Sequence, residues 1–246
     1  MAQHHYNPQF MEYADRSSIY SARKVSMLLR PLLHVRSVLD VGCAKGTWLN
    51  AWKEAGVDEI MGVDGGYVDP NTLVIARDRF VPTDLAERLE LGHRFDLVQS
   101  LEVAEHIRAD AADQFVENLV RHSAGIILFS AAPPGQGGEF HVNEQPYDYW
   151  REKFRRHGFE AYDYVRPLVA ADTTVSFWYR FNTILYAHDS RAPALPANVR
   201  MTRIPSETEI QDIAPGWFRL RKRLIRHLPF IISQQLARLT AQWRSR

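Results

Sequence analysis

Residues 37–55, SVLDVGCAKGTWLNAWKEA, combine a short β-branched strand, a glycine-bounded turn and a helix over 47–55. Gly42 and Gly46 permit a tight turn and a close approach of the backbone to a ligand. The following helix offers N–H groups at its first turn. The spacing differs from the G-x-G-x-x-G of dinucleotide binders. The unit predicts an α/β fold with a ligand beside the loop.

Further strands are expected to complete a central, mostly parallel sheet. A second strand, 59–63, ends at Asp64, where an acidic side chain can accept hydrogen bonds from a ribose diol. The apolar run 95–101 predicts a buried parallel strand, and 125–130 predicts another. Two last strands are expected at 159–165 and 177–187, and helices at 109–122 and 147–157, the second ended by Gly158.

Length and composition favour one catalytic domain with appendages. The chain has 246 residues, of which 46% are hydrophobic and 11% aromatic, enough for a substantial core. No window approaches the roughly 18 apolar residues of a membrane span, and the first 30 residues are unlike a signal peptide. A single cysteine, Cys43, excludes an intramolecular disulfide and a cysteine-cluster zinc site. We therefore expect a soluble cytoplasmic protein.

The N-terminal segment, 1–36, is expected to form a helical arm. It carries aromatic residues at Tyr6, Phe10, Tyr13 and Tyr20, and a helix over 16–30 is expected to stop or kink at Pro31. The arm could cover a cofactor pocket, or its aromatic side chains could pack the helix onto the sheet.

The basic charge is concentrated at the other end of the chain. Residues 213–246 hold eight of the 30 Lys and Arg and no acidic residue, which leaves 22 basic against 29 acidic side chains in 1–212. An acidic body argues against a broad nucleic-acid interface. After a proline-rich linker that begins at 189, residues 215–246 predict a basic amphipathic helix. It suits peripheral contact with the inner membrane face, packing on the catalytic domain, or a homodimer.

The candidate catalytic turn lies at 95–107, FDLVQSLEVAEHI. The strand 95–101 is followed directly by Glu102, Glu105 and His106, which share one face if the chain coils into a helical turn. Two carboxylates and an imidazole then converge at the carboxyl end of the sheet, where α/β proteins bind ligands. In an alternative interpretation Glu102 caps the next helix, Glu105 is solvated and His106 packs under the sheet.

The segment DVGCAKG at 40–46, Asp64 and the triplet Thr83-Asp84-Leu85 resemble the cofactor motifs of class I S-adenosylmethionine-dependent methyltransferases. The resemblance covers residues 38–188 and implies a Rossmann-like sheet of seven strands flanked by helices, with the last two strands antiparallel. It implies cofactor contacts from seven residues, with Ala44 standing where many members have glycine: Asp40, Gly42, Gly46, Asp64, Asp84, Leu85 and Leu101.

Glu102, Glu105 and His106, with His141 in the loop 131–146, are similar to the Glu-x-x-Glu-His plus distal His set of small-RNA 3′-terminal 2′-O-methyltransferases. The first three also resemble a motif of ubiquinone-biosynthesis O-methyltransferases. The resemblance implies a divalent metal held by these four residues and a metal-assisted methylation of a hydroxyl group. Mg²⁺, Mn²⁺, Fe²⁺, Co²⁺ and Zn²⁺ all suit two carboxylates and two imidazoles.

We therefore expect an O-methyltransferase, with His141, His106 and Glu105 as catalytic residues. A sugar hydroxyl on a glycan, nucleotide-sugar or glycosylated natural product is the expected acceptor, because clustered aromatic residues near 147–150 and 177–179 could stack on sugar rings. Three alternatives stay open: an RNA 2′-O-methyltransferase, a metal-independent enzyme with His141 as general base, and a non-catalytic cofactor-binding or membrane-docking protein.

Overall fold

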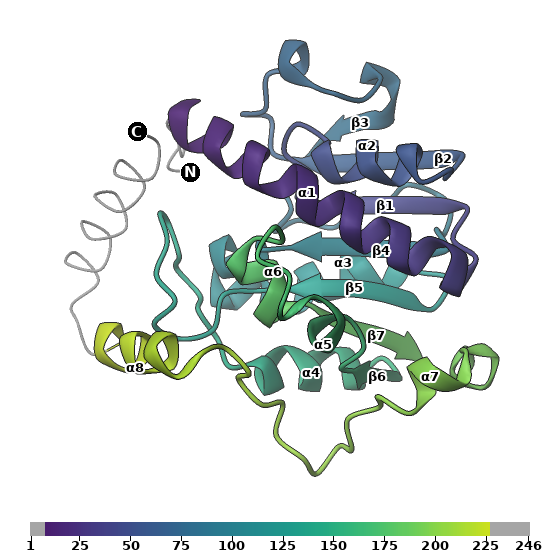
Figure 1. The fold of residues 1–246 in the computed structure, drawn as a ribbon. Coiled ribbons are helices and arrows are strands. Elements are labelled where there is room, and N and C mark those ends of the chain that lie inside the picture. Colours follow the sequence, from purple (N-terminus) through teal and green to yellow (C-terminus); the bar gives the residue numbers. More distant parts are fainter. Residues whose placement is uncertain (1–7, 227–246) are drawn as a thin grey trace.

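A seven-stranded sheet with helices on both faces forms the centre of the protein (Figure 1). The computed structural model describes residues 8–226, with side chains described from residue 18 onward. The strand order is β3-β2-β1-β4-β5-β7-β6, and β7 is antiparallel to both of its neighbours. The expected class I methyltransferase sheet is confirmed. Its strands are β1 (Ser37–Val41), β2 (Glu59–Asp64), β3 (Phe80–Pro82), β4 (Leu97–Leu101), β5 (Ile126–Ser130), β6 (Phe159–Tyr162) and β7 (Ile184–His188).

Hydrophobic cores fill both sides of the sheet, because every residue of β1, β4 and β5 is buried and successive side chains face opposite sides. Helices α1 and α2 cover one face, and α3 and α4 cover the other. The α-helices are α1 (Pro8–Leu33), α2 (Thr47–Glu54), α3 (Ala112–His122), α4 (Tyr147–Arg155), α5 (Val165–Val169), α6 (Phe177–Asn182), α7 (Ala197–Arg200) and α8 (Gly216–Ile225). Short 3-10 turns are η1 (Pro70–Thr72), η2 (Arg77–Arg79), η3 (Ala104–His106), η4 (Ala109–Ala111) and η5 (Ala192–Ala194).

The strand order reverses between β1 and β4, and this reversal decides where a ligand can bind. From β1 the chain proceeds outward to β2 and β3, and it then returns to place β4 on the other side of β1. In α/β sheets, ligands bind at the carboxyl edge beside such a reversal. The glycine loop leaves β1 there, and Glu102 begins the loop that leaves β4.

Helix α1 corrects the expectation of an arm that stops or kinks at Pro31. The helix begins at Pro8 and continues through Pro31 to Leu33. A proline in the last turn removes only one helical hydrogen bond, and the helix ends at His34, which has a φ of 52°. Ala22, Val25 and Leu29 are buried in the core, so this part of the segment packs onto the domain. Of the four aromatic residues in the arm, the structure describes the side chain of Tyr20 alone, and it is exposed.

The expected strand over 177–187 is wrong in its first half. Residues Phe177–Asn182 form α6, and the strand begins at Ile184. Phe177 and Phe181 lie one helical turn apart and their ring centroids are 4.6 Å from each other, so the aromatic run has helical and not strand periodicity. Likewise β6 ends at Tyr162, earlier than expected, and Val165 begins α5.

The segment after β7 is more ordered than the expected linker. It contains η5 and α7, and the amide of Ile204 donates to the carbonyl oxygen of Ala161, which extends the pairing beside β6. Within residues 8–226, no helix is long and apolar enough to cross a membrane. The predicted boundaries at 36 and 188 stay predictions.

Arg166 is the buried charge that joins the last elements of the domain. Its side chain is 1% exposed, makes two hydrogen bonds of 2.7 Å to Asp163, and donates to the carbonyl oxygens of Phe181 and Gln211. It therefore ties α5 to the end of α6 and to the segment before α8.

We expect Arg166→Met to lower the free energy of unfolding by about 3 kcal/mol, because it leaves Asp163 and two carbonyl groups without their donor. Urea denaturation measures the change. Arg203→Met is the matched control: Arg203 pairs with Glu160 at 3.4 Å and its side chain is 53% exposed, so a change within about 0.5 kcal/mol is expected. Equal losses for the two variants would contradict the role of Arg166.

Candidate active site

The loop after β1 is held against the end of β2. The amides of Gly42 and Cys43 both donate to the carbonyl oxygen of Val63, at 2.8 and 3.2 Å. Gly42 and Gly46 have φ values of 91° and 85°, which glycine adopts without strain. Ala44 has a φ of 48°, so it occupies the left-handed region at the position where many class I methyltransferases have glycine. The alanine therefore keeps the backbone shape at some cost in strain.

Asp64 fixes this loop from the end of β2. One of its carboxylate oxygens accepts from the amide of Ala44 at 2.6 Å, and the other accepts from Gly65 and from the hydroxyl of Tyr67. Burial raises the pKa of Asp64, and these hydrogen bonds oppose the rise. The Asp64 carboxylate thus lies beside the glycine loop, as a ribose contact requires.

Asp40 is the second buried carboxylate at the cofactor loop. It lies in β1 and is 3% exposed. Burial raises its pKa from 3.8 to about 7. A cation beside it, such as the ammonium group of a methionyl moiety, would favour the charged form.

The other predicted cofactor residues lie around the same edge. Leu101 ends β4 and is buried, and Leu85 is half-buried. Asp84 is exposed, two residues beyond β3, and its carboxylate accepts from the amide of Ala86. Val103 packs over Gly42, where a Cβ atom would overlap its side chain. The loops after β1 and β4 are therefore in contact, which joins the cofactor region to the candidate catalytic turn.

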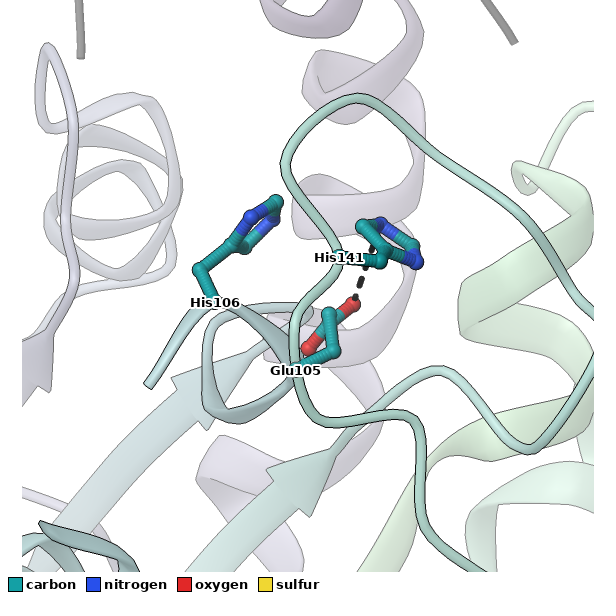
Figure 2. A group of neighbouring side chains, drawn as sticks. All are labelled: Glu105, His106 and His141. Carbon is teal, nitrogen blue, oxygen red and sulfur yellow. Dashed lines mark ion pairs between the residues drawn. The ribbon is translucent and has the colours of Figure 1, made fainter. Parts of the chain in front are cut away.

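Glu105, His106 and His141 come together beyond β4 (Figure 2). Ligand atoms from the three side chains all lie within 4.8 Å of one another, and Nε2 of His141 is 3.9 Å from Oε1 of Glu105. The two imidazole rings are 4.9 Å apart between centroids and nearly perpendicular. Figure 2 shows the Glu105 carboxylate pointing toward His141, with His106 beside them. The structure thus brings together three of the four residues that the resemblance implied as metal ligands.

Backbone hydrogen bonds bring the distal histidine into place. The amides of Val142 and Asn143 both donate to the carbonyl oxygen of Glu105, at 2.9 and 3.0 Å. This attaches the loop 131–146 to η3, although it lies more than 30 residues away in the sequence. The ring of His141 packs over Gly138, where a Cβ atom would overlap it.

The Glu105 carboxylate lies buried in this cluster. Its side chain is 1% exposed, and among the described residues neither oxygen has a hydrogen-bond partner of normal geometry. Burial first, and then the charge of Glu102, raise the pKa of Glu105 well above its ordinary value, while the nearby amide of Ala132 lowers it less. A buried carboxylate of this kind is neutralised by a proton or by a bound cation.

Each histidine is oriented through its Nδ1 atom. Nδ1 of His141 is 2.7 Å from Glu144, and Nδ1 of His106 is 3.2 Å from the carbonyl oxygen of Phe140. An acceptor at Nδ1 favours the tautomer with the proton there and the lone pair on Nε2, the form that binds a cation or accepts a proton. Glu144 is itself held by the amides of Gly135 and Gly137.

Glu102 corrects the expectation of a single helical face. It has a φ of 57°, and the helical turn η3 begins only at Ala104, so Glu102 does not share a helical face with Glu105 and His106. Its carboxylate accepts from Asn182 at 3.0 Å and from Gln136 at 2.9 Å. Burial raises the pKa of Glu102, and these donors oppose the rise. Glu102 is outside the group of three that could hold a metal.

Sequence reasoning missed the residues that support the site. Glu144 could have been found from its position three residues after His141, but Gln136 and Asn182 carry no local signal. Asn182 ends α6, a segment for which the sequence predicts a strand. Its side chain also accepts from the hydroxyl of Tyr147 at 2.9 Å. Tyr147 and Trp150, considered as stacking surfaces, are buried in the core.

The chain matches a family model described as a methyltransferase domain over residues 11–166, more than half of its length. It therefore belongs to the methyltransferase-domain family and is an S-adenosylmethionine-dependent methyltransferase. No curated protein matched in a sequence comparison.

Solved structures show the same fold at low identity. Magnesium protoporphyrin IX methyltransferase (ChlM) from Synechocystis PCC 6803 with bound SAM is 18% identical over 76% of this chain and 86% of that chain, with a TM-score of 0.53. CalS10, an amino pentose methyltransferase from Micromonospora echinaspora, is 16% identical over 76% and 99%, with a TM-score of 0.53. DesVI from Streptomyces venezuelae is 20% identical over 48% and 52%, with a TM-score of 0.39, so the chain spans about half of its length.

We expect cofactor affinity to depend on the protonation of Asp40. Because its pKa is about 7 in the free protein, binding of the cofactor ammonium should weaken up to about tenfold for each pH unit below 7. Calorimetric titration with S-adenosylhomocysteine between pH 5.5 and 8.5 measures this. Asp40→Asn should bind weakly at every pH, and a wild-type affinity that is flat over this range would contradict the assignment.

The raised pKa of Asp40 also determines how the stability of the cofactor-free protein changes with pH. The folded-state pKa of about 7 exceeds the ordinary 3.8, so the folded state holds the extra proton between these values. The stability contribution of Asp40 is therefore present below pH 3.8 and is lost as the pH rises to 7.

Proposed function

We propose that this methyltransferase methylates a hydroxyl group of a sugar-containing acceptor with the help of a divalent cation held by Glu105, His106 and His141. The observation that carries the proposal is the buried Glu105 carboxylate, which has no hydrogen-bond partner of normal geometry among the described residues and lies beside two imidazoles. A cation supplies the missing partner and the missing charge. Glu102, the fourth predicted ligand, instead holds the wall of the site through Asn182 and Gln136.

The donor set fits a small divalent cation. Two ligands at about 2.1 Å from one ion lie at most about 4.2 Å apart, and the three ligand atoms here already lie within 4.8 Å of one another. Side-chain shifts below about 1 Å would therefore complete the contact. One carboxylate and two neutral imidazoles suit Mn²⁺, Fe²⁺, Co²⁺ and Zn²⁺ better than Mg²⁺, which prefers oxygen ligands.

Methyl transfer breaks the carbon–sulfur bond of the sulfonium, forms a carbon–oxygen bond, leaves S-adenosylhomocysteine as the thioether product and passes the hydroxyl proton to solvent. A divalent cation in this site would supply Lewis acidity that lowers the pKa of an acceptor hydroxyl. The chain itself positions the reactants, since Val103 of the catalytic turn packs on Gly42 of the cofactor loop. The loop 131–146 is attached to the same turn through the hydrogen bonds that Val142 and Asn143 donate to the carbonyl oxygen of Glu105.

A sugar acceptor is supported by the chemistry of the site and by the fold neighbours. Most sugars contain a vicinal diol, whose two neighbouring oxygens can both bind one cation. CalS10 is described as acting on an amino pentose, and KedS8 from Streptoalloteichus sp. ATCC 53650 is described as a sugar N-methyltransferase; it has a TM-score of 0.52 and 16% identity over 72% of this chain and 87% of that chain.

A metal-independent reaction with His141 as general base is the second candidate. The hydrogen bond of 2.7 Å between Glu144 and Nδ1 of His141 favours it, because a carboxylate at Nδ1 stabilises the imidazolium formed when Nε2 accepts a proton. Both candidates use the same tautomer of His141, and only the first needs a cation.

We expect the wild-type protein to bind one Mn²⁺ or Co²⁺ ion and Glu105→Gln to bind it at least about tenfold more weakly, because the anionic ligand is lost. Calorimetric titration with each metal salt measures this. His188→Asn is the histidine control, since His188 lies at the opposite edge of the sheet beside Phe159. Methylation of a panel of methyl glycosides should stop in EDTA and return with Mn²⁺. Turnover that persists in EDTA, with no metal bound by the wild type, would favour the His141 base.

The hydrogen bond that Glu144 accepts from Nδ1 of His141 leads to a separate prediction. Glu144→Gln keeps the size of the side chain but removes the charge that fixes the His141 ring, so metal affinity should fall about 10- to 100-fold. Binding of S-adenosylhomocysteine should stay unchanged, because Glu144 lies on the other loop. Unchanged metal affinity would mean that Glu144 only shapes the loop.

A further inference from the structure

Helix α8 is fixed to the catalytic domain along one side. Lys222 forms an ion pair with Asp212 at 2.5 Å, and Arg221 donates to the carbonyl oxygen of Gln136 at 2.9 Å. The ring of Phe218 packs on Phe177 of α6, with centroids 4.3 Å apart. The helix therefore has a defined orientation beside the loop 131–146, and Figure 1 shows it there at the edge of the molecule.

A second side of α8 presents an apolar stripe. Trp217, Leu220 and Leu224 follow the spacing of one helical face, and they are 65%, 57% and 65% exposed. Among the described residues, four of the eleven exposed large hydrophobic side chains lie between residues 213 and 224. This is a concentration of apolar side chains and not the usual single scattered ones.

Positive charge lies directly beside this stripe. Arg219, Arg223 and Arg226 are exposed and spaced four and three residues apart, so they share the neighbouring side of the helix. No acidic residue follows Asp212 in the sequence, whereas residues 1–212 carry more acidic than basic side chains. The exposed surface of α8 is thus apolar along one line and cationic along the next.

We propose that α8 docks this methyltransferase on the surface of an anionic phospholipid bilayer. Trp217, Leu220 and Leu224 would enter the boundary between headgroups and acyl chains, and the three arginines would meet lipid phosphates. The apolar stripe covers on the order of a few hundred Å², below the about 800 Å² per partner of a stable protein interface, so a second copy of this chain fits it less well. A bilayer requires only such a shallow stripe with adjacent positive charge.

Docking in this way would also orient the enzyme. The contacts of Arg221 and Lys222 leave α8 no freedom to turn, so the bilayer would lie beside the loop 131–146 that carries His141. The proposal goes beyond the proposed reaction and does not depend on it, because it concerns a surface outside the catalytic group.

Flotation of the full chain with vesicles tests the proposal. The wild type should bind vesicles of phosphatidylcholine with 30% phosphatidylglycerol and should not bind pure phosphatidylcholine. Trp217→Ala/Leu220→Ala/Leu224→Ala should weaken binding roughly tenfold or more. Arg219→Gln/Arg223→Gln/Arg226→Gln should weaken it about fivefold per arginine, and added salt should weaken the wild type in the same way.

A matched control removes the same amount of exposed apolar surface elsewhere. Met27, Leu168 and Met201 lie on other elements and are exposed, so Met27→Ala/Leu168→Ala/Met201→Ala should bind vesicles like the wild type. Thermal melting and titration with S-adenosylhomocysteine confirm that each variant is folded.

Three results would overturn the proposal. The first is no vesicle binding by the wild type, and the second is equal binding to neutral and anionic vesicles. The third is wild-type binding by the apolar triple variant. If sedimentation shows instead that this variant alone turns a dimer into monomers, the stripe is a contact between copies of the chain.

Discussion

The carbonyl oxygen of Glu105 is the acceptor on which the geometry of the site depends. It accepts hydrogen bonds from the amides of Val142 and Asn143. Through these bonds the proline- and glycine-rich loop 131–146 is attached to the turn after β4. That loop contains no helix or strand, so side chains and other loops supply its backbone hydrogen bonds. His141 lies next to the attachment point, so the same two hydrogen bonds that order the loop also determine where its imidazole lies.

Several buried carboxyl groups lie near the carboxyl edge of the sheet, where burial destabilises their charged form. Asp40, Asp64 and Glu105 are almost fully buried, and burial raises the pKa of each of them. The three respond differently to their surroundings: Asp64 is well supplied with donors, whereas Glu105 has none of normal geometry among the described residues. Such groups reduce stability until a ligand of opposite charge binds, which is the usual relation between function and stability at an active site.

Much of this arrangement could be predicted from the sequence because its signals are local. Apolar runs identified β1, β4 and β5, and the glycine spacing identified the loop after β1. The position of Glu105 and His106 followed from the rule that parallel strands end at one edge, and the meeting with His141 was implied by the family resemblance. Glu102 could not be placed, because its left-handed backbone and its two amide donors depend on residues 34 and 80 positions away. The aromatic run of α6 was predicted as a strand for a related reason. Its residues generally favour strands, and its helical conformation depends on contacts with α1 and α8, which are distant in the sequence.

The contact between α8 and the loop 131–146 constrains how the protein can diverge. Gly135 lies so close to the carbonyl oxygen of Lys222 that a Cβ atom there would overlap it, and Arg221 donates to the next residue of the loop. Substitutions in one segment therefore require compatible residues in the other, although some 80 residues separate them. Exchange of the loop between related enzymes would keep this contact only if residues 212 to 226 were exchanged with it.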